Sequence, residues 1–250
     1  MILVKSADEI ALMAEAGRIV AETLEELKGE AAPGVSTIEL ERLAEGLMVK
    51  KGGKPAFKGY RGYPASICAS VNDQVVHGIP SERKLKDGDI LSIDLGVYYK
   101  GYYGDAALTV AVGSASAEAL RLMRVTEESL WLGIAQAVEG NRVSDISNAV
   151  QRHVEANGFS VVRTFVGHGI GRQLHEEPQV PNFGPPGKGA RLARGMALAI
   201  EPMVNAGGWR VNVLDDGWTA VTADRSLSAH YEHTVIVTDG EPKILTKLTK

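Results

Sequence analysis

Four acidic side chains and one histidine have the types and spacing that metal chemistry needs. Asp94 and Glu201 each follow a mostly apolar, strand-like run, and Glu232 stands near the start of another. Asp105 lies in a second run close to Asp94, and His168 has a glycine on either side. A carboxylate that directly follows an apolar strand needs a partner for its charge. Carboxylate oxygens with one imidazole form a hard ligand set that suits Mn, Fe, Co or Zn, so the pattern indicates a metal site.

The charge of these four acids favours two metal ions over one. Two carboxylates about 5 Å apart repel each other by roughly 3 kcal/mol at an effective dielectric constant of about 20. Four acids that converge without cations would take up protons or move apart. A pair of divalent ions balances the charge of four carboxylates, so we expect a dinuclear site.

A predicted β-hairpin brings two of the acids together. Residues 89–98 and 102–111 form two apolar-rich runs on either side of Lys100-Gly101, which suits a two-residue turn. In that register Asp94 faces Ala107, and Asp105 is its diagonal neighbour on the same face of the sheet. One alternative stays open at this point, in which both acids are ordinary solvated strand residues and the glycine-flanked histidine is structural.

A weak internal repeat relates the two halves of the chain at an offset of about 107 residues. The run that ends in Asp94 matches the run that ends in Glu201, and Val35-Ser36-x-Ile38 matches Val143-Ser144-x-Ile146. Capping motifs and apolar stripes predict two helices in each half, ahead of the sheet residues. The sheet of the first half is expected to include residues 72–76, beginning at Asn72, and His168 is expected in a glycine-rich loop. Two copies of so long a unit indicate a pseudo-symmetric duplication. We expect a single domain, residues 1–250, whose halves, about 1–113 and 114–250, share one sheet and one site.

Composition excludes several classes of protein. The 250 residues carry a net charge of −4 without a basic cluster, which argues against nucleic-acid binding through phosphate neutralisation. The single cysteine, Cys68, excludes an intrachain disulfide and a cysteine-rich zinc module. Neither a membrane-length apolar run nor a signal-peptide core is present, so we expect a cytoplasmic protein without a membrane partner.

Taken together, the motifs resemble those of the methionine aminopeptidases, in particular the short, bacterial-style type I form. The resemblance covers nearly the whole chain and is carried by His77-Gly78-Ile79-Pro80, Ser92-Ile93-Asp94-Leu95-Gly96, Gly104-Asp105, Gly167-His168-Gly169-Ile170-Gly171, His175-Glu176-Glu177-Pro178, Ile200-Glu201-Pro202 and Tyr231-Glu232-His233-Thr234. It implies an α+β pita-bread fold, in which two pseudo-symmetric αβ halves share a curved antiparallel sheet with the helices outside.

The resemblance also implies a role for each candidate ligand. Asp105 and Glu232 would bridge two divalent ions (Co, Mn, Fe or Zn), Asp94 would hold one ion, and His168 with Glu201 would hold the other. In two-metal hydrolases, aminopeptidases among them, the ions lower the pKa of a shared water from 15.7 to about 7, which supplies a hydroxide nucleophile near neutral pH.

Three residues are implied as catalytic. Glu201 would carry the proton of the attacking water. His77 and His175 would hydrogen-bond the scissile peptide and stabilise the charge of the tetrahedral intermediate. The two histidines are not expected to bind metal.

A pocket for an unbranched thioether side chain is implied as well. Phe57, Tyr60, Tyr63 and Cys68 match one wall of that pocket in the family, and Trp218 matches the opposite side. Aromatic and sulfur-bearing walls suit the polarizable sulfur of methionine.

Three positions depart from the common pattern of the family. Phe57 stands where a cysteine is common, Leu174 where an aromatic residue is common, and His230 where glutamine is frequent. These changes affect the shape of the pocket and the preference for inhibitors rather than the chemistry. Asn72 and Ser228 match a site for one monovalent cation, Na⁺ or K⁺, in relatives.

The function implied is removal of the N-terminal methionine from nascent polypeptides whose second residue is small, by a monomer in transient contact with the ribosome. Only 30 residues separate Glu201 from Glu232, which leaves no space for the inserted helical segment of type II enzymes. Two alternatives remain. One is a prolidase or Xaa-Pro aminopeptidase, which usually carries an additional N-terminal domain. The other is a binding module that has lost its metals, although all five ligands are present here.

Overall fold

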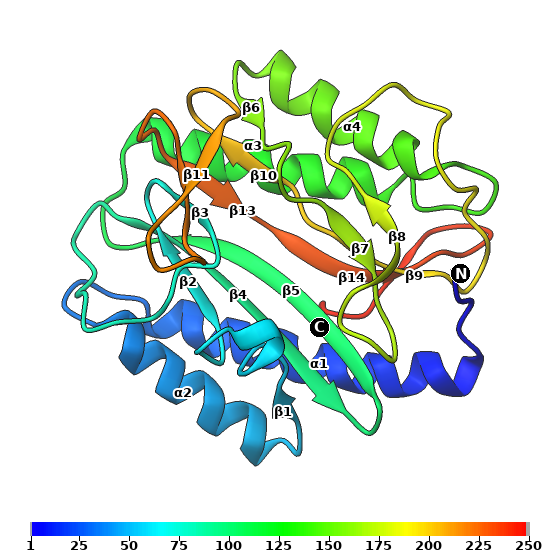
Figure 1. The fold of residues 1–250 in the computed structure, drawn as a ribbon, viewed down its shortest axis with the longest axis horizontal. Coiled ribbons are helices and arrows are strands. Elements are labelled where there is room, and N and C mark those ends of the chain that lie inside the picture. The colour runs from blue at the N-terminus through cyan, green and yellow to red at the C-terminus, as the bar shows by residue number, and fades with distance from the viewer. Residues whose placement is uncertain (1, 249–250) are drawn as a thin grey trace.

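The computed structural model describes residues 2–248, and in each half of the chain two helices precede a series of strands (Figure 1). The helices are α1 (Ala7–Glu30), α2 (Thr37–Lys50), α3 (Ala117–Ile134) and α4 (Val143–Ala156), with a short 3₁₀ turn, η1 (Tyr60–Gly62). The strands are β1 (Lys54–Pro55), β2 (Cys68–Val71), β3 (Gln74–Val76), β4 (Ile90–Tyr99), β5 (Tyr102–Ala111), β6 (Ser160–Val161), β7 (Gly167–Gly169), β8 (Glu176–Val180), β9 (Ala197–Ile200), β10 (Met203–Asn205), β11 (Val211–Val213), β12 (Ala220–Thr222), β13 (Ser228–His230), β14 (Glu232–Ile236) and β15 (Lys243–Ile244). Among the described residues, no helix is both long and apolar enough to cross a membrane.

The helices begin where capping residues predict that they should. Ser6 caps α1: its hydroxyl accepts a hydrogen bond from the Glu9 amide, and the Glu9 carboxylate accepts one from the Ser6 amide. Ser36 and Glu39 make the same reciprocal capping box for α2. Each pair satisfies amides that the first turn of a helix leaves without intrahelical partners. The predicted starts of these helices are therefore confirmed.

One large antiparallel sheet joins the two halves of the chain. Its strands follow the order β1-β4-β5-β14-β9-β7-β8, with β2 also paired to β4 and β15 to β14. All of these pairings are antiparallel. The prediction of a shared antiparallel sheet is confirmed, and two small three-stranded sheets, β13-β10-β6 and β11-β12-β3, are added to it.

The central hairpin has the register that its turn predicts. Strands β4 and β5 pair over ten residues each, and Asp94 faces Ala107. Two details of the sequence interpretation were wrong. His168 lies in a strand, β7, rather than in a loop, because its backbone pairs with β8 and β9. Asn72 belongs to the turn between β2 and β3, where its φ of 59° cannot continue a strand.

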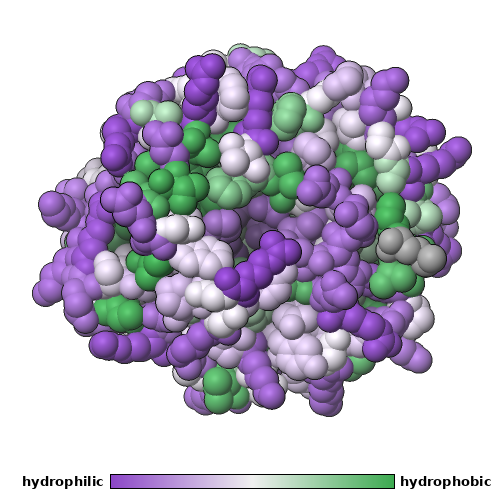
Figure 2. All heavy atoms as spheres, viewed as in Figure 1, coloured by the Kyte–Doolittle hydropathy of each residue, from purple (hydrophilic) through white to green (hydrophobic). Residues whose placement is uncertain are grey.

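The helices form two pairs at opposite edges of the molecule, with the sheet between them (Figure 1). Helix α1 packs on β4 and β5, and α2 packs on α1 and β1. A buried cluster that includes Val20, Leu24, Leu91 and Leu95 fills the space between α1 and the sheet. The face of the molecule that is turned toward the viewer is hollowed near its middle (Figure 2).

Helix α1 approaches β5 so closely that only glycine fits between them. A Cβ placed on Gly104 would lie 2.8 Å from the amide nitrogen of Gly17 and 3.1 Å from the carbonyl carbon of Ala16. Both atoms belong to the backbone and cannot rotate away. Because Asp105 follows Gly104 directly, this contact also fixes the position of that acid.

Replacing Gly104 with alanine should therefore force α1 and β5 apart. Overpacking of this kind costs about 2 kcal/mol, which lowers the melting temperature of a domain of this size by on the order of 5 °C. Scanning calorimetry measures the change.

Gly46→Ala is the matched control. Gly46 lies inside α2, and a Cβ there meets no described atom within 4 Å. Alanine should stabilise that helix by up to about 1 kcal/mol. Equal melting temperatures for the Gly104→Ala variant and the wild type would contradict the close approach of α1 and β5.

Candidate metal centre and active site

The candidate ligands lie on one face of the sheet, in two adjacent rows. Each row consists of residues that face one another across neighbouring strands. In the first row Asp94 on β4 faces Ala107 on β5, which in turn faces Glu232 on β14. In the second row Asp105 lies beside Thr234, whose hydroxyl accepts from the Asp105 amide and donates to the Asp105 carbonyl. Residues two apart on a strand point to the same face, so both rows present their carboxylates on one side.

His168 and Glu201 complete the cluster from β7 and from the end of β9. His168 faces Ala199, which faces Thr234 of the second row. Glu201 follows the last residue of β9, and its Oε1 lies 3.5 Å from Nε2 of His168. Single ligand atoms of Asp105, His168 and Glu232 all lie within 4.8 Å of one another. The five candidate ligands predicted from the sequence thus come together at one place.

Unpaired buried oxygens show that the cluster fits a cation. Asp94 Oδ1, Asp105 Oδ1 and Glu232 Oε1 are buried and have no hydrogen-bond partner among the described residues. Asp105 and Glu232 are 4% and 2% exposed, so bulk solvent hardly reaches their carboxylates. A buried carboxylate oxygen without a partner costs several kcal/mol, which bound divalent ions would offset. The residues present therefore fit a metal site.

Burial also raises the proton affinity of these acids. It raises the pKa of Asp94 to about 7. Burial is likewise the main reason that the pKa values of Asp105, Glu201 and Glu232 lie well above their usual range, and the neighbouring carboxylates raise them further. The metal-free site consequently binds protons at neutral pH.

His168 is prepared for a metal through its Nε2 atom. Its Nδ1 lies 2.9 Å from the carbonyl oxygen of Gly169, an arrangement in which Nδ1–H donates and Nε2 keeps its lone pair. Burial lowers the pKa of His168 to about 4, which keeps the imidazole neutral. A neutral imidazole is the form that binds metals.

A cavity of about 160 Å³ opens beside the acids. Such a volume is smaller than that of a site for a drug-sized ligand and suits a single side chain. All of the predicted pocket residues line it, namely Phe57, Tyr60, Tyr63, Cys68 and Trp218, together with Leu174, His77 and His175. Arg61 lies within the stretch from Phe57 to Tyr63 that was compared with the pocket wall, but it was not named as a site residue; it also lines this cavity.

The two predicted catalytic histidines reach the cavity from different loops. His175 Nδ1 lies 2.8 Å from the Tyr60 hydroxyl, and the two rings stack with centroids 5.2 Å apart. His77 stands edge-on to Phe165 and Trp218. Burial and the nearby His168, Arg61 and His77 lower the pKa of His175 to about 3, so it is neutral at pH 7.

Three other residues named from the sequence lie outside this cavity. The Asn72 carbonyl accepts a hydrogen bond from the Ser228 amide at 2.8 Å, which places the two residues of the predicted cation site side by side. His230 is buried, and its Nε2 lies 3.9 Å from Glu201 Oε2, without a hydrogen-bond partner among the described residues.

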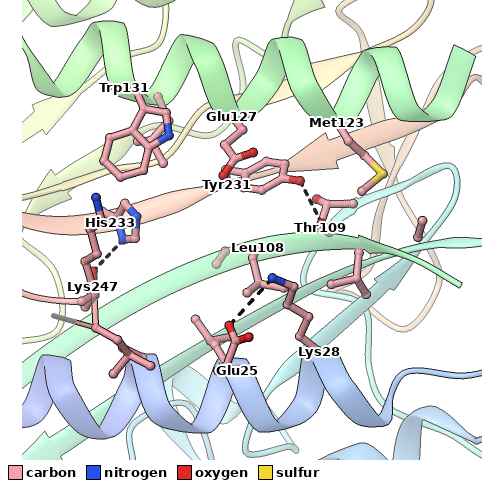
Figure 3. A pocket seen from close by; sticks show the side chains of 18 residues that line it. Glu25, Lys28, Leu108, Thr109, Met123, Glu127, Trp131, Tyr231, His233 and Lys247 are labelled. Carbon is pink, nitrogen blue, oxygen red and sulfur yellow. Dashed lines mark hydrogen bonds and ion pairs between the residues drawn. The ribbon is translucent and has the colours of Figure 1, made fainter. Parts of the chain in front are cut away.

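A larger cleft, of about 590 Å³, lies on the opposite face of β5 and β14 (Figure 3). Tyr231 and His233 line it, whereas Glu232 between them lines the cavity beside the acids, as alternation along a strand requires. Glu25, Lys28 and Lys247 border this cleft, but no cluster of acids converges there. The chemistry therefore belongs to the smaller cavity.

An antiparallel sheet that presents four carboxylates and one neutral imidazole beside an apolar pocket defines a metallopeptidase. The chain belongs to metallopeptidase family M24, whose profile matches residues 11–239. Its fold is accordingly the pita-bread fold of that family.

Relatives of known name cover the whole chain. A methionine aminopeptidase of Clostridium perfringens is 58% identical over 246 residues, 98% of this chain and 99% of its own. Methionine aminopeptidase 1 of Bacillus subtilis is 54% identical over 248 residues, 99% of this chain and all of its own. The crystal structure of the Thermotoga maritima methionine aminopeptidase superposes with a TM-score of 0.98 at 49% identity, covering 99% of this chain and all of the other.

A more distant structure shares the fold alone. The prolidase of Pyrococcus horikoshii has a TM-score of 0.81 at 23% identity, and the match covers 99% of this chain but only 64% of the prolidase.

Removing metal should destabilise the protein, because the buried acids then face one another without cations. A ligand at about 1,000 times its dissociation constant adds roughly 4 kcal/mol of stability. At about 2–4 °C per kcal/mol, the melting temperature should fall by on the order of 10 °C after chelation and recover with excess Mn or Co. An unchanged value in a sample shown by mass spectrometry to be metal-free would contradict the convergence of the acids.

The same metal-free protein should become more stable as the pH falls from 8 to 7. The acids have folded pKa values above their unfolded values, so protonation stabilises the fold, and this stability is lost as pH rises through the folded pKa, about 7 for Asp94. Each carboxyl group that is protonated only in the folded state adds about 1.4 kcal/mol per pH unit. The metal-loaded protein should lack this gain, since protons compete with metal for the acids. Calorimetry of both forms at the two pH values separates them.

Proposed function

We propose that this protein removes the N-terminal methionine from polypeptides whose second residue is small, in a metal-dependent hydrolysis of the first peptide bond. The observation that carries the proposal is the convergence of two buried and two half-buried carboxylates with one neutral imidazole beside a small, aromatic-walled cavity. The relatives named methionine aminopeptidase, with more than half of their residues identical over the full chain, support the choice of substrate.

Two divalent ions would be held by the five candidate ligands. Asp105 and Glu232 would bridge the ions, Asp94 would bind one, and His168 with Glu201 would bind the other. The unpaired buried oxygens of three of these acids support the assignment. When bound, the ions would acidify a shared water, so that hydroxide is available near neutral pH. Co, Mn, Fe and Zn all suit such a ligand set.

The proton of the attacking water would pass to Glu201. The carboxylate of Glu201 lies 3.5 Å from His168 and keeps part of its surface open to the cavity, which allows it to exchange a proton. Burial and two neighbouring acids raise the pKa of Glu201 well above its usual range, so the group accepts a proton readily.

The two histidines would hold the scissile peptide. His175 contacts the Tyr60 hydroxyl through Nδ1, which leaves Nε2 for the substrate. Because His175 is neutral at pH 7, it would act as a hydrogen-bond donor rather than as a charge. His77, held edge-on by Phe165 and Trp218, would contact the peptide from another loop. Such fixed donors favour the charge that develops on the carbonyl oxygen.

The methionine side chain would occupy the cavity between Phe57, Tyr63, Cys68 and Trp218. Tyr63 and Trp218 meet edge to face with centroids 5.2 Å apart, and the Tyr63 hydroxyl donates to backbone carbonyls. These contacts hold the walls before a substrate arrives. An unbranched thioether makes favourable contacts with aromatic edges.

Further proposals concern the protein as a whole. We assign residues 1–250 to one catalytic domain whose halves, about 1–113 and 114–250, arose by duplication. The order of the sheet supports this, because β4 of the first half and β9 of the second half flank the central pair β5–β14 symmetrically.

We assign the protein to the cytoplasm, as a monomer that acts on nascent chains in transient contact with the ribosome. Asn72 and Ser228 would contribute to a site for Na⁺ or K⁺, which their adjacent backbones support.

Asp105→Asn should abolish turnover while retaining the fold. Loss of a bridging ligand should reduce kcat/KM by at least about 100-fold, since even the partners of metal ligands are worth 10- to 100-fold. The metal-free variant should also be more stable than the metal-free wild type, because a neutral amide replaces a carboxyl group that must either keep a buried charge among like charges or take up a proton at neutral pH.

A purely structural role for Asp105 would instead lower both activity and metal-free stability. Asp239→Asn, at an exposed acid far from the cluster, is the matched control and should change neither. Activity above a few per cent of wild type with metal in excess would refute the bridging role.

Specificity for a small second residue tests the substrate proposal. In competition, Met-Ala-Ser should be cleaved on the order of 100-fold more efficiently than Met-Lys-Ser, because a long side chain would clash with the loops that carry His77 and His175. Ala-Pro peptides, the substrates of the prolidase alternative, should not be cleaved. Equal kcat/KM for the two methionine peptides would refute the steric account, and preferential cleavage of Ala-Pro would favour the alternative.

A further inference from the structure

A trough lined mainly by charged and amide-bearing residues adjoins the cavity beside the acids. It has a volume of about 600 Å³, runs along the hairpin formed by β7 and β8, and shares Arg61, His168 and His175 with the smaller cavity. A peptide whose methionine occupies the smaller cavity has its following residues close to this shared border. Successive residues of an extended chain advance by about 3.3–3.6 Å, so the third and fourth residues come within reach of a long side chain there.

Arg61 stands at that border on a rigid turn. Its φ of 50° and ψ of 21° lie in the left-handed region, between Gly59 with φ 84° and Gly62 with φ 91°. Backbone hydrogen bonds from Gly59 to Tyr63 and from Gly62 to Gly59 close the turn on either side. The fixed backbone directs the side chain toward the mouth of the site rather than letting it follow a flexible loop.

The guanidinium is also held above the catalytic machinery. Its central carbon lies 5.4 Å from the centroid of the Tyr60 ring. Tyr60 in turn contacts His175 through the hydrogen bond described above. Stacking on an aromatic ring leaves the in-plane N–H groups of arginine free to meet another group.

The charge of Arg61 is unpaired, unlike that of its neighbour in the trough. No carboxylate of the described residues lies within 4 Å of the Arg61 guanidinium, whereas Arg172 is paired with Glu9 at 3.1 Å. Glu176 is held by Lys5 at 2.6 Å. Glu177 lines the trough but not the smaller cavity. Among the described residues that line both, Arg61 is the one with a full positive charge.

We propose that Arg61 is a specificity residue that binds a carboxylate on the third residue of the peptide. The inference rests on the proposed function, since it concerns the path of the same substrate. An arginine fork binds a carboxylate through two parallel hydrogen bonds. Because the site is exposed, we expect a preference of about threefold, within the range for exposed ion pairs.

Amidated peptides test the proposal. Met-Ala-Asp-Ser-amide should have a kcat/KM about threefold above that of Met-Ala-Asn-Ser-amide at low salt, and the ratio should approach one in 0.5 M NaCl. Arg61→Gln should bring the ratio to about one at low salt, and Arg61→Glu should bring it below one. Arg172→Gln is the matched control: its charge is already paired, so it should keep the wild-type ratio.

A short peptide with a free C-terminus offers Arg61 a second kind of carboxylate, besides that of an aspartate side chain. Met-Ala-Ser with a free C-terminus, compared with its amide, shows whether Arg61 also binds that group, and Arg61→Gln should remove any difference. Such a difference without an aspartate effect would overturn the proposed side-chain recognition.

Failure of this inference differs from failure of the proposed function. If the wild type cleaves both amidated peptides equally at low salt, or if Arg61→Glu retains the preference, the role of Arg61 is refuted while the function stands. If neither peptide is cleaved, the function is refuted. In that case Arg61 is tested by binding alone. The aspartate and asparagine peptides are made with a reduced first peptide bond, and their affinities for the metal-loaded protein are measured by calorimetry. The aspartate analogue should bind about threefold more tightly, and equal affinities would refute the role of Arg61.

Discussion

The site depends on holding four largely desolvated carboxylates close together against their mutual repulsion. The sheet supplies the restraint, because Asp94, Asp105 and Glu232 occupy fixed register positions on three paired strands. Small residues make this possible: Ala107 separates two of the acids within one row, and a Cβ on Gly96 would collide with the Phe57 ring. Bulkier residues there would fill the space in which the acids converge.

The junction between the two halves carries most of this restraint. Strands β5 and β14 pair through only two residue pairs, Glu232 with Ala107 and His233 with Ala106. Thr234 extends the contact by bonding both backbone groups of Asp105. On the other side, Thr246 near the C-terminal end accepts a hydrogen bond from the Thr234 amide and contacts His233 Nδ1. The strand that carries Glu232 is thus held by side chains where the backbone ladder is short.

Local features were predictable from the sequence, and long-range features were not. Capping residues such as Ser6 and Ser36 and the Lys100-Gly101 turn act over a few residues, so the helix starts and the register of Asp94 opposite Ala107 followed from them. The pairing of β5 with β14 joins residues more than 100 positions apart; the internal repeat and the resemblance to a family predicted a shared sheet, but neither identified this pair of strands. The same limit explains why His168 was read as a loop residue, since its strand exists only through partners on β8 and β9. The contact of Tyr60 with His175 and the border position of Arg61 likewise depend on how distant loops meet.

Burial acts in opposite directions on the two kinds of ligand, and the difference explains why this site needs cations. It lowers the pKa of His168 to about 4, which produces the neutral imidazole that binds metal. It raises the pKa values of Asp94, Asp105, Glu201 and Glu232, which opposes the ionised form that binds metal. Protons and metal ions therefore compete for the carboxylates but hardly for the histidine. A divalent ion carries more charge than a proton and contacts several carboxylates at once, so it wins this competition at neutral pH where it is available. The fold alone prepares the imidazole, whereas the acids are fully ionised at neutral pH only when the metal is bound.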